Sequence, residues 1–248
     1  MFDPFWAHGI IRRAIEHKII FASTINIRDY ARDRHQVTDD RPYGGGSGMV
    51  MKPEPLAAAI RTAIREIPAA GKILLTPQGR PFDQNMAREL AALDGLVLIC
   101  GRYEGVDERI CHDLIDYEIS IGDYVLTGGE LAAMIIVDAV TRLIPGALGG
   151  QDAAQNDSFS NGLLEHAHYT RPRNYEGREV PEILLSGHHQ EIEMWRLESS
   201  LMRTLLKRSD LLRQKNLDRQ EIKILEKWHR EINEVLELYH KKEGKALI

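Results

Sequence analysis

The sequence contains little cysteine and no long uninterrupted apolar run. Its two cysteines, Cys100 and Cys111, are too few for a disulfide framework and favour a reducing cytoplasm. No apolar stretch approaches the roughly 18 residues that indicate a membrane-spanning helix. The N-terminus also lacks the basic, apolar and small-residue blocks of a secretory signal. We therefore expect a cytoplasmic protein that is neither secreted nor inserted in a membrane.

The composition is typical of a folded globular protein. Hydrophobic residues make up 43% and charged residues 28% of the 248 positions, enough for one large domain or two small domains with real cores. The net charge of −5 argues weakly against nucleic-acid binding, but the chain from Tyr169 onward is mildly basic and the part before it is acidic. Basic clusters there could contact phosphates. Ordinary solvated helix faces explain them equally well on charge alone.

Short apolar runs alternate with helical patterns in the first half of the chain. Strands are predicted at Lys72–Thr76, Leu96–Cys100 and Tyr117–Ser120, and helices at Asp83–Leu93, Val106–Ile115 and Gly129–Ile144. Continuous apolar strands alternating with helices predict an α/β fold, in which a mostly parallel sheet carries helices on both faces. Such sheets bind ligands outside the carboxyl ends of their strands.

Each predicted strand ends in a polar loop that contains glycine. The loops are Pro77-Gln78-Gly79-Arg80, then Gly101-Arg102-Tyr103-Glu104-Gly105, then Ile121-Gly122-Asp123-Tyr124 followed by Gly128-Gly129-Glu130. One such loop is common, and each could be only a tight turn. Three at equivalent strand ends predict one shared pocket, because glycine lets backbone amides approach a ligand closely.

The remaining segments suggest a loop, a linker and a second domain. Arg32–Met51 is a long polar loop whose GGGSG run lacks the GK[ST] ending of a nucleotide-phosphate loop. Residues 149–170 have no strong periodicity and predict a mobile interdomain linker. Beyond them, His188–Lys207 and Asp218–Lys241 carry apolar residues at three- and four-residue spacing. This spacing predicts a small all-helical domain.

Several blocks of this sequence match one known family in order and over nearly the whole chain. They are DRHQVTDDRPYGGGSGMVM, LTPQGRPFDQ, LICGRYEGVDERI, EISIGDYVLTGGELAAM, RLIPGALG, DSFSNGLLEHAHYTRP and VPEILLSGHH. With these blocks the chain resembles the bacterial tRNA (guanine-N1)-methyltransferases of the SPOUT class. So many ordered blocks make the match far more specific than a single short motif.

The resemblance implies a fold and a set of partners. Residues 1–148 would form a trefoil-knotted, cofactor-binding methyltransferase domain, a rare exception to the rule that chains do not thread loops. Residues 149–170 would be the linker and 171–248 a helical tRNA-binding domain. The resemblance also implies a homodimer, with each active site built from both subunits. The methyl donor would be S-adenosylmethionine and the target N1 of the guanine immediately 3′ of the tRNA anticodon (guanosine-37), with no role for DNA.

The sequence departs from the family pattern at its start. The family normally begins with a short apolar strand that leads into Phe-Pro-Glu-Met-Phe, whereas this sequence begins at Met1-Phe2-Asp3. The first strand is therefore expected to be missing, either because the start codon was called too late or because the protein is truly shorter. Its loss would remove ladder hydrogen bonds and expose a sheet edge.

The glycine loops supply the cofactor site that the resemblance implies. Main-chain groups would bind the adenine, and Glu104 would approach the cationic amino-acid end. Glu104 would also help to bind Mg²⁺, although a single carboxylate is a weak metal site. The predicted cofactor-binding residues are Pro77, Gln78, Gly79, Gly101, Tyr103, Glu104, Ile121, Gly122, Asp123, Tyr124, Val125, Leu126, Gly128 and Gly129.

Two residues downstream of these loops are candidates for catalysis. Asp157, in the linker, would accept the N1 proton as general base. Arg142, at the end of a predicted helix, would donate hydrogen bonds to O6, where negative charge develops. Taken without the family, Asp157 is more typical of a turn or helix cap than of a general base, and Arg142 is equally typical of a cation at a helix C-terminus.

Basic residues are candidates for phosphate contacts with RNA. Binding through such contacts weakens as the salt concentration rises. A base in the anticodon loop can be splayed out and stacked. The candidates are Arg102, Arg171 and Arg173, with Arg203, Lys207 and Arg208 in the helical domain. Several of them could simply lie on solvated faces. His166, His168 and the pair His188-His189 lack evident metal-ligand partners, so a zinc-type cluster is not expected.

Two other functions compete with methyl transfer. One is an RNA-binding protein that has lost catalysis, and such a protein would be expected to lose Asp157 or Arg142, which both remain. The other is a nucleotide-dependent oxidoreductase on an α/β sheet. That class requires GxGxxG between a strand and a helix, with an acidic residue about 20 positions later, and the sequence contains no such unit.

Overall fold

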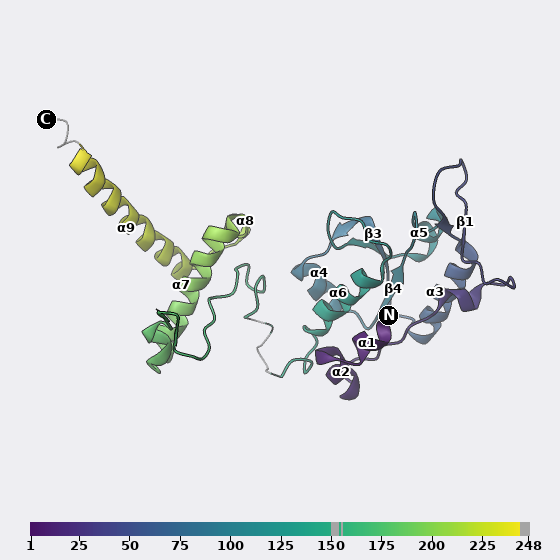
Figure 1. Ribbon diagram of the computed structural model, residues 1–248, viewed down its shortest axis with the longest axis horizontal. Coiled ribbons are helices and arrows are strands. Elements are labelled where there is room, and N and C mark those ends of the chain that lie inside the picture. The colour runs from purple at the N-terminus through teal and green to yellow at the C-terminus, as the bar shows by residue number, and fades with distance from the viewer. Residues whose placement is uncertain (150–153, 155, 244–248) are drawn as a thin grey trace. The chain divides into compact units, whose positions relative to one another are not determined.

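The computed structural model describes residues 1–149, 154 and 156–243 (Figure 1). The chain divides into two compact units, Met1–Ala154 and Gln155–Ile248. Part of the predicted linker, at 150–153 and 155, lies outside the described residues. The mobility predicted for 149–170 therefore stays a prediction.

A parallel sheet forms the centre of the first unit. Its strands are β3 (Gly71–Pro81), β4 (Leu96–Cys100) and β5 (Tyr117–Ser120), in the order β4-β3-β5. The packed helices are α3 (Pro53–Glu66), α4 (Gln84–Ala91), α5 (Glu108–Leu114) and α6 (Glu130–Thr141). The predicted α/β fold with helices on both faces of a parallel sheet is confirmed.

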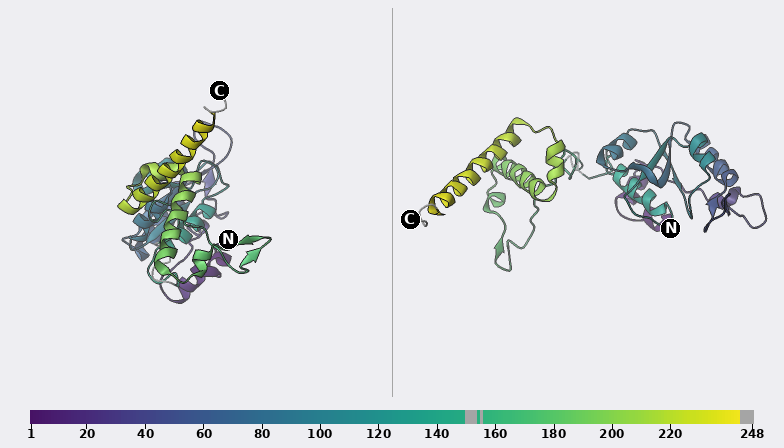
Figure 2. Two further views of the ribbon diagram at one scale, coloured as in Figure 1. Left: turned by 90° about the vertical axis from the view of Figure 1, so that its left-hand side faces the viewer. Right: turned by 90° about the horizontal axis from the view of Figure 1, so that it is seen from above.

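Alternation along β3 produces a core on each face of the sheet. Ile73 and Leu75 pack with α4 and α6 on one face, while Leu74 packs with α3 and α5 on the other. Successive strand residues point to opposite faces, so a strand buried on both faces is apolar throughout. The helix pairs lie on opposite sides of the sheet in both Figure 1 and Figure 2.

Strand β3 continues beyond the predicted end at Thr76. Leu75 is opposite Ile119, and Arg80 is opposite the same residue after a register shift. Residues 76–79 therefore bulge out while the strand resumes its pairing with β5 at Arg80 and Pro81. The predicted loop at Pro77–Arg80 is thus a bulge within a longer strand, because the chain returns to the same neighbour.

The N-terminal part of this unit contains short elements. They are α1 (Phe2–Trp6), α2 (Gly9–Glu16), η1 (Ile27–Tyr30), β1 (Asp39–Asp40) and β2 (Val50–Met51). Strands β1 and β2 pair antiparallel within the segment predicted as a long polar loop. Four glycines between them, Gly44, Gly45, Gly46 and Gly48, have positive φ, which L side chains rarely adopt. That segment is therefore a hairpin with a glycine-rich tip.

The second unit is mainly helical. Its elements are β6 (Asn174–Tyr175), β7 (Arg178–Glu179), η2 (Glu182–Leu185), α7 (His189–Lys207), α8 (Ser209–Gln214) and α9 (Arg219–Glu243). Leu163, Leu201 and Ile224 form its buried core. The predicted helices are present, but the all-helical prediction overlooked the β6–β7 hairpin. Its turn, Glu176-Gly177, has positive φ at both residues, the geometry of a two-residue hairpin.

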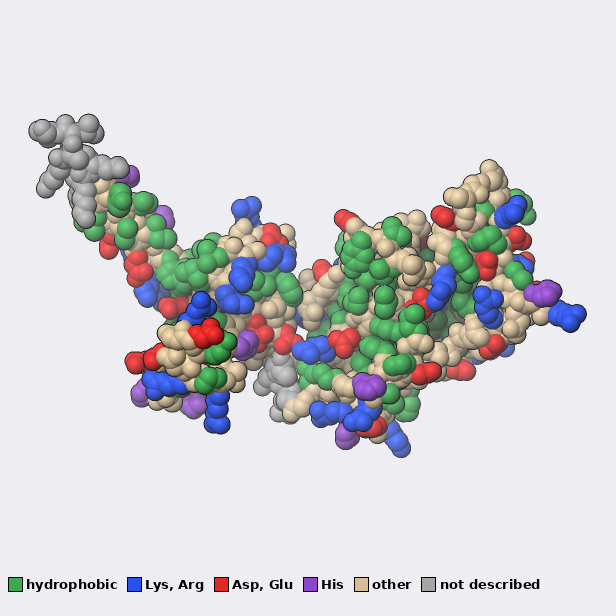
Figure 3. Space-filling model, viewed as in Figure 1, with side chains coloured by type: hydrophobic (Ala, Val, Ile, Leu, Met, Phe, Trp, Pro, Cys, Tyr) green, Lys and Arg blue, Asp and Glu red, His purple; other side chains and the backbone are tan. Residues whose placement is uncertain are grey.

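Helix α9 exposes an apolar stripe in its outer half. Ile232, Val235, Leu238 and Tyr239 are each more than half exposed, and green side chains mark this helix in Figure 3. Among the described residues, no helix combines the length and the apolar character that a membrane crossing requires.

Asp116 joins β3 to the start of β5. Its carboxylate accepts a hydrogen bond from the Lys72 backbone N–H at 2.9 Å, and Lys72 Nζ lies 2.8 Å from the same oxygen. Burial alone would raise the pKa of Asp116, but the side-chain and backbone hydrogen bonds from Lys72 and its positive charge lower it overall. The ionised carboxylate is therefore the form that stabilises the sheet.

We predict that Asp116→Asn lowers the free energy of unfolding at pH 7 by about 1 kcal/mol, because a partly exposed charge-assisted contact is lost. A lowered carboxyl pKa gives stability that is present above the unfolded pKa of about 3.9 and is lost as pH falls through the lower folded value. The difference between wild type and variant should therefore shrink below about pH 4. Urea denaturation at several pH values measures this, with the exposed Asp113→Asn as control. An equal effect of both substitutions would contradict the role of Asp116.

Candidate functional site

A cavity of about 350 Å³ lies where β3, β4 and β5 end, as the strand-end loops predicted. All of the predicted cofactor-binding residues line it except Gly79 and Asp123. Other lining residues were missed by the sequence reasoning, which looked only at loops. They include Val106, Glu108, Cys111 and Ala132, from the first turns of the flanking helices and their approaches.

Glycine is required where backbone segments touch at the rim of the cavity. A Cβ on Gly79 would lie 2.4 Å from the Glu118 carbonyl carbon and from the Ile119 nitrogen. A Cβ on Gly129 would lie 2.8 Å from the Cys100 Cα. Real Cβ atoms essentially never approach backbone this closely. Gly79 therefore shapes the cavity by holding the bulge of β3 against β5, although it does not line the cavity itself.

The loop after β4 is fastened to the hairpin of β1 and β2. The Glu104 N–H donates to the Met49 carbonyl at 3.0 Å, and the Met51 N–H donates to the Gly105 carbonyl at 2.9 Å. A Cβ on Gly48 would lie 2.3 Å from a Glu104 carboxylate oxygen. The glycine-rich hairpin, which lies in the segment predicted as a long polar loop, thus forms part of the support of the site.

Arg102 connects the loop after β4 to the one before α6. Its guanidinium forms an ion pair with Glu130 at 2.7 Å. The same two loops are joined by a β-bridge between Arg102 and Gly128 and by the Gly129 N–H, which donates to the Gly101 carbonyl at 2.9 Å. Predicted as an RNA contact, Arg102 lines the cavity and is engaged in this ion pair.

The loop after β5 is ordered by its own side chains. The Tyr124 hydroxyl donates to the Ile121 carbonyl at 3.2 Å. Gly122 has φ of 144°, and a Cβ there would lie 2.6 Å from the Tyr124 ring. Val125 is 86% exposed. The loop therefore presents main-chain groups and apolar side chains rather than charges to the cavity.

The two predicted catalytic residues lie on different units. Arg142 is the C-cap of α6 and is half-buried. Asp157, also half-buried, begins a turn in which its carbonyl accepts a hydrogen bond from the Ser160 N–H at 3.1 Å. These positions match the simpler roles of helix-end cation and turn residue, and they leave the catalytic roles as predictions.

The predicted RNA contacts differ in their surroundings. Arg171 and Arg173 are exposed. Arg208 forms an ion pair with Asp210 at 2.7 Å, and its guanidinium lies 5.9 Å from the Phe159 ring centroid. Arg203 is half-buried, and its Nε is enclosed without a hydrogen-bond partner. Lys207 is exposed like Arg171 and Arg173, so these three are more accessible for phosphate contact than the enclosed Arg203 and the paired Arg208.

The structure changes the expectation about metal ligands. Within the described part of the chain, Glu104 belongs to no cluster of three convergent His, Cys, Asp or Glu ligands. A Mg²⁺ ion there would therefore not be held by such a cluster. His166 and His168 were expected to lack partners, and this was wrong. Glu165 lies close to both, so that the three side chains form one cluster.

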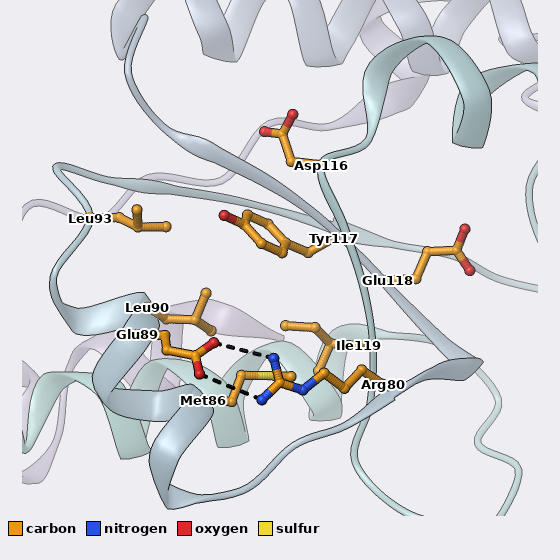
Figure 4. A pocket seen from close by; sticks show the side chains of 9 residues that line it. All are labelled: Arg80, Met86, Glu89, Leu90, Leu93, Asp116, Tyr117, Glu118 and Ile119. Carbon is orange, nitrogen blue, oxygen red and sulfur yellow. Dashed lines mark hydrogen bonds and ion pairs between the residues drawn. The ribbon is translucent and has the colours of Figure 1, made fainter.

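A second hollow, of about 260 Å³, lies between α4 and β5 (Figure 4). Leu90, Ile119 and Met86 line it, and all three belong to the core between the sheet and α4. The ion pair of Arg80 with Glu89, at 3.3 Å, spans its rim. The strand-end loops 101–105 and 121–129 do not reach it. It is therefore a surface hollow over the core that shares only Ile119 with the lining of the candidate site.

The first unit is an α/β domain whose parallel sheet carries a glycine-lined cavity at the carboxyl ends of its strands. Residues 1–214 match the model of the family described as "tRNA (Guanine-1)-methyltransferase TrmD". The chain belongs to this family.

Curated relatives agree with the family match. A tRNA (guanine-N(1)-)-methyltransferase of Desulfatibacillum aliphaticivorans is 55% identical over 236 residues, which cover 95% of this chain and 90% of the relative. That of Geobacter sulfurreducens is 56% identical, covering 88% of this chain and 89% of the relative. That of Staphylococcus carnosus is 50% identical over 232 residues, which cover 94% of this chain and 94% of the relative.

We predict that Gly79→Ala destabilises the first unit by about 1–3 kcal/mol, the usual cost of overpacking. The added methyl group would collide with backbone of β5, which cannot rotate away as a side chain could. Thermal denaturation measures the effect. Gly149→Ala is the control, because a Cβ there meets nothing within 4 Å. Equal melting temperatures for the two variants would contradict the tight contact.

We also predict that Cys100 is unreactive in the folded protein. Burial, followed by the negative charge of Glu130, raises the pKa of the Cys100 thiol to about 12, and Arg102 lowers it only partly. The thiolate is the reactive form, so iodoacetamide at pH 8 should leave Cys100 unmodified in native protein and label it in urea. Peptide mass spectrometry reads the site directly. Rapid labelling of native Cys100 would contradict its burial.

Proposed function

We propose that this protein transfers a methyl group from S-adenosylmethionine to N1 of the guanine immediately 3′ of a tRNA anticodon, guanosine-37. The observation that carries the proposal is the single cavity formed by the three strand-end loops, which contain the motifs shared with the family. The relatives carry the name tRNA (guanine-N(1)-)-methyltransferase, which supports both the reaction and the nucleic acid.

The cavity suits a nucleoside cofactor with an amino-acid tail. It combines main-chain groups of the loop 121–126 with apolar side chains such as Val125 and Leu126, and it places the carboxylate of Glu104 at its edge. Pockets of this kind use a few polar groups for orientation and apolar surface for affinity. The cofactor supplies an electrophilic methyl group on a sulfonium. In this proposal Glu104 faces its cationic amino-acid end and is the carboxylate that we assign to Mg²⁺.

The acceptor base needs help from the protein. N1 of guanine carries a proton, and its lone pair becomes a good nucleophile only when that proton leaves. In this proposal Asp157 accepts the proton. The negative charge spreads to O6, where the guanidinium of Arg142 donates hydrogen bonds. In this proposal the exposed Arg171 and Arg173 contact RNA phosphates. The proposed substrate is tRNA and not DNA.

The proposal also includes a trefoil knot in the first unit and a homodimer. The knot is proposed from the family to which the chain belongs. Helix α6 supports dimerisation, because Leu131 and Ile135 are 52% and 46% exposed on a helix that is otherwise packed on the core. In the proposed dimer, both subunits contribute residues to each active site. We place the protein in the cytoplasm.

We predict that the protein labels a tRNA that carries guanine after the anticodon when it is supplied with methyl-labelled S-adenosylmethionine. A tRNA with adenine at that position is the control substrate. Cofactor binding is measured separately by calorimetry. If the cofactor and tRNA bind but no label is transferred, the protein is an RNA-binding member of the family that has lost catalysis, and the proposal is wrong.

Two substitutions test the catalytic assignments. Asp157→Asn should lower kcat by roughly 10²- to 10⁴-fold, the usual contribution of a general base, with cofactor affinity unchanged. Arg142→Lys should lower kcat by about 10²-fold, because lysine keeps the charge but loses the forked donors. Asp94→Asn, in the exposed turn after α4, and Arg65→Lys, in the last turn of α3, are matched controls. Unchanged turnover would remove either residue from the mechanism.

A further inference from the structure

Three potential metal ligands converge in the second unit. Glu165, His166 and His168 each offer one ligand atom, and these atoms all lie within 4.8 Å of one another. His168 Nε2 is 3.0 Å from Glu165 Oε1, and the two imidazole centroids are 4.4 Å apart. No residue from another part of the chain is needed, so the cluster is complete within one unit.

Hydroxyl groups hold the backbone of this segment in place. The Glu165 N–H donates to the Ser158 hydroxyl oxygen at 3.0 Å. The Ala167 N–H, between the two histidines, donates to the Ser199 hydroxyl oxygen of α7, also at 3.0 Å. Fixed backbone positions lower the entropy that ligand side chains lose when they bind a metal.

The hydrogen bond of His166 leaves one ring nitrogen ready to bind a metal. His166 Nδ1 lies 3.1 Å from the Ala167 carbonyl oxygen. A carbonyl oxygen can only accept, so Nδ1 carries the proton in this contact and Nε2 keeps its lone pair. Metal-binding histidines typically donate the other ring N–H to such a carbonyl. The Trp195 ring, with its centroid 6.3 Å from that of His166, provides an apolar wall.

We propose that Glu165, His166 and His168 bind a divalent transition-metal ion with the preferences of Zn²⁺. Two imidazoles and one carboxylate are a known Zn²⁺ ligand set, and they leave the fourth tetrahedral position open to water. Ligands at about 2.0–2.1 Å from the ion lie roughly 3.3 Å apart. Glu165 and His168 already approach this spacing, and the ligand atom of His166 lies within 4.8 Å of both.

The competing explanation is a surface ion pair between Glu165 and His168. Such a pair contributes little to stability, and it gives no role to His166. The chain offers a natural comparison on α5, where His112 Nε2 lies 3.6 Å from Glu108 Oε1. That pair has a carboxylate and an imidazole but belongs to no three-ligand cluster among the described residues. It should not bind a metal tightly.

The experiment is calorimetric titration of the untagged full-length protein with Zn²⁺, without tRNA or cofactor. We expect one tight site per chain in the wild type and in the control variant His112→Ala. His166→Ala and His168→Ala should each weaken this site by at least about tenfold, a minimum taken from the effect of losing outer-shell partners. Glu165→Gln, which keeps the side-chain volume, should weaken it as well. The experiment does not depend on the proposed methyl transfer, so either proposal can fail alone.

A second measurement separates metal binding from folding. Circular dichroism should show the same helix content in all variants without metal. Co²⁺ should give the visible absorption of a four-coordinate site in the wild type and in His112→Ala, but not in His166→Ala. The proposal is overturned if the wild type has no stoichiometric site, or if its affinity is indifferent to His166 and His168.

Discussion

The site depends on the direct contact of backbone segments at the carboxyl edge of the parallel sheet. Gly79 lies against β5 and Gly129 lies against the end of β4, each with less room than one methyl group needs. Interiors packed to this density respond to even one added carbon atom. The cavity therefore takes its shape from main-chain geometry, and its lining residues inherit their positions from that contact.

The sequence predicted the scaffold well because the scaffold is set by local patterns. Strands β4 and β5 have the predicted bounds, since each is a short segment followed by a glycine-containing loop, and β4 is apolar throughout. The Asp83 carboxylate accepts the Met86 N–H at 2.8 Å, as expected of the N-cap of α4. The loops at the strand ends were predicted to share a pocket, and they do.

Features that depend on pairing between distant segments could not be predicted in the same way. The second half of β3 is a strand only because Arg80 returns to Ile119, which periodicity within β3 does not reveal. The ion pair of Arg102 with Glu130 joins residues 28 positions apart. The β6–β7 hairpin did have a local signal, the Glu176-Gly177 turn, within a segment too short for strand periodicity. The partner of His168 was also local, but only the side-chain rotamers bring it into contact.

The two units contain different parts of the candidate machinery. The first unit contains the cavity, whose polar character comes largely from backbone groups, and it contains Arg142. The second contains Asp157, exposed arginines and the histidine cluster. A rigid sheet edge suits the binding of one small molecule, whereas side chains on a separate helical unit suit a larger and more variable surface such as RNA.

Helix α7 has a second role beyond packing. The extended segment beside it forms no β ladder there, and its backbone is held by side-chain hydroxyls of that helix. Thr204 accepts from the Leu164 N–H at 2.9 Å, Ser200 donates to the Leu164 carbonyl, and Ser199 accepts from the Ala167 N–H. The position of the extended segment along α7 is thus set by the spacing of these hydroxyl groups on the helix. A rotation of α7 about its axis would therefore move this segment together with the helix.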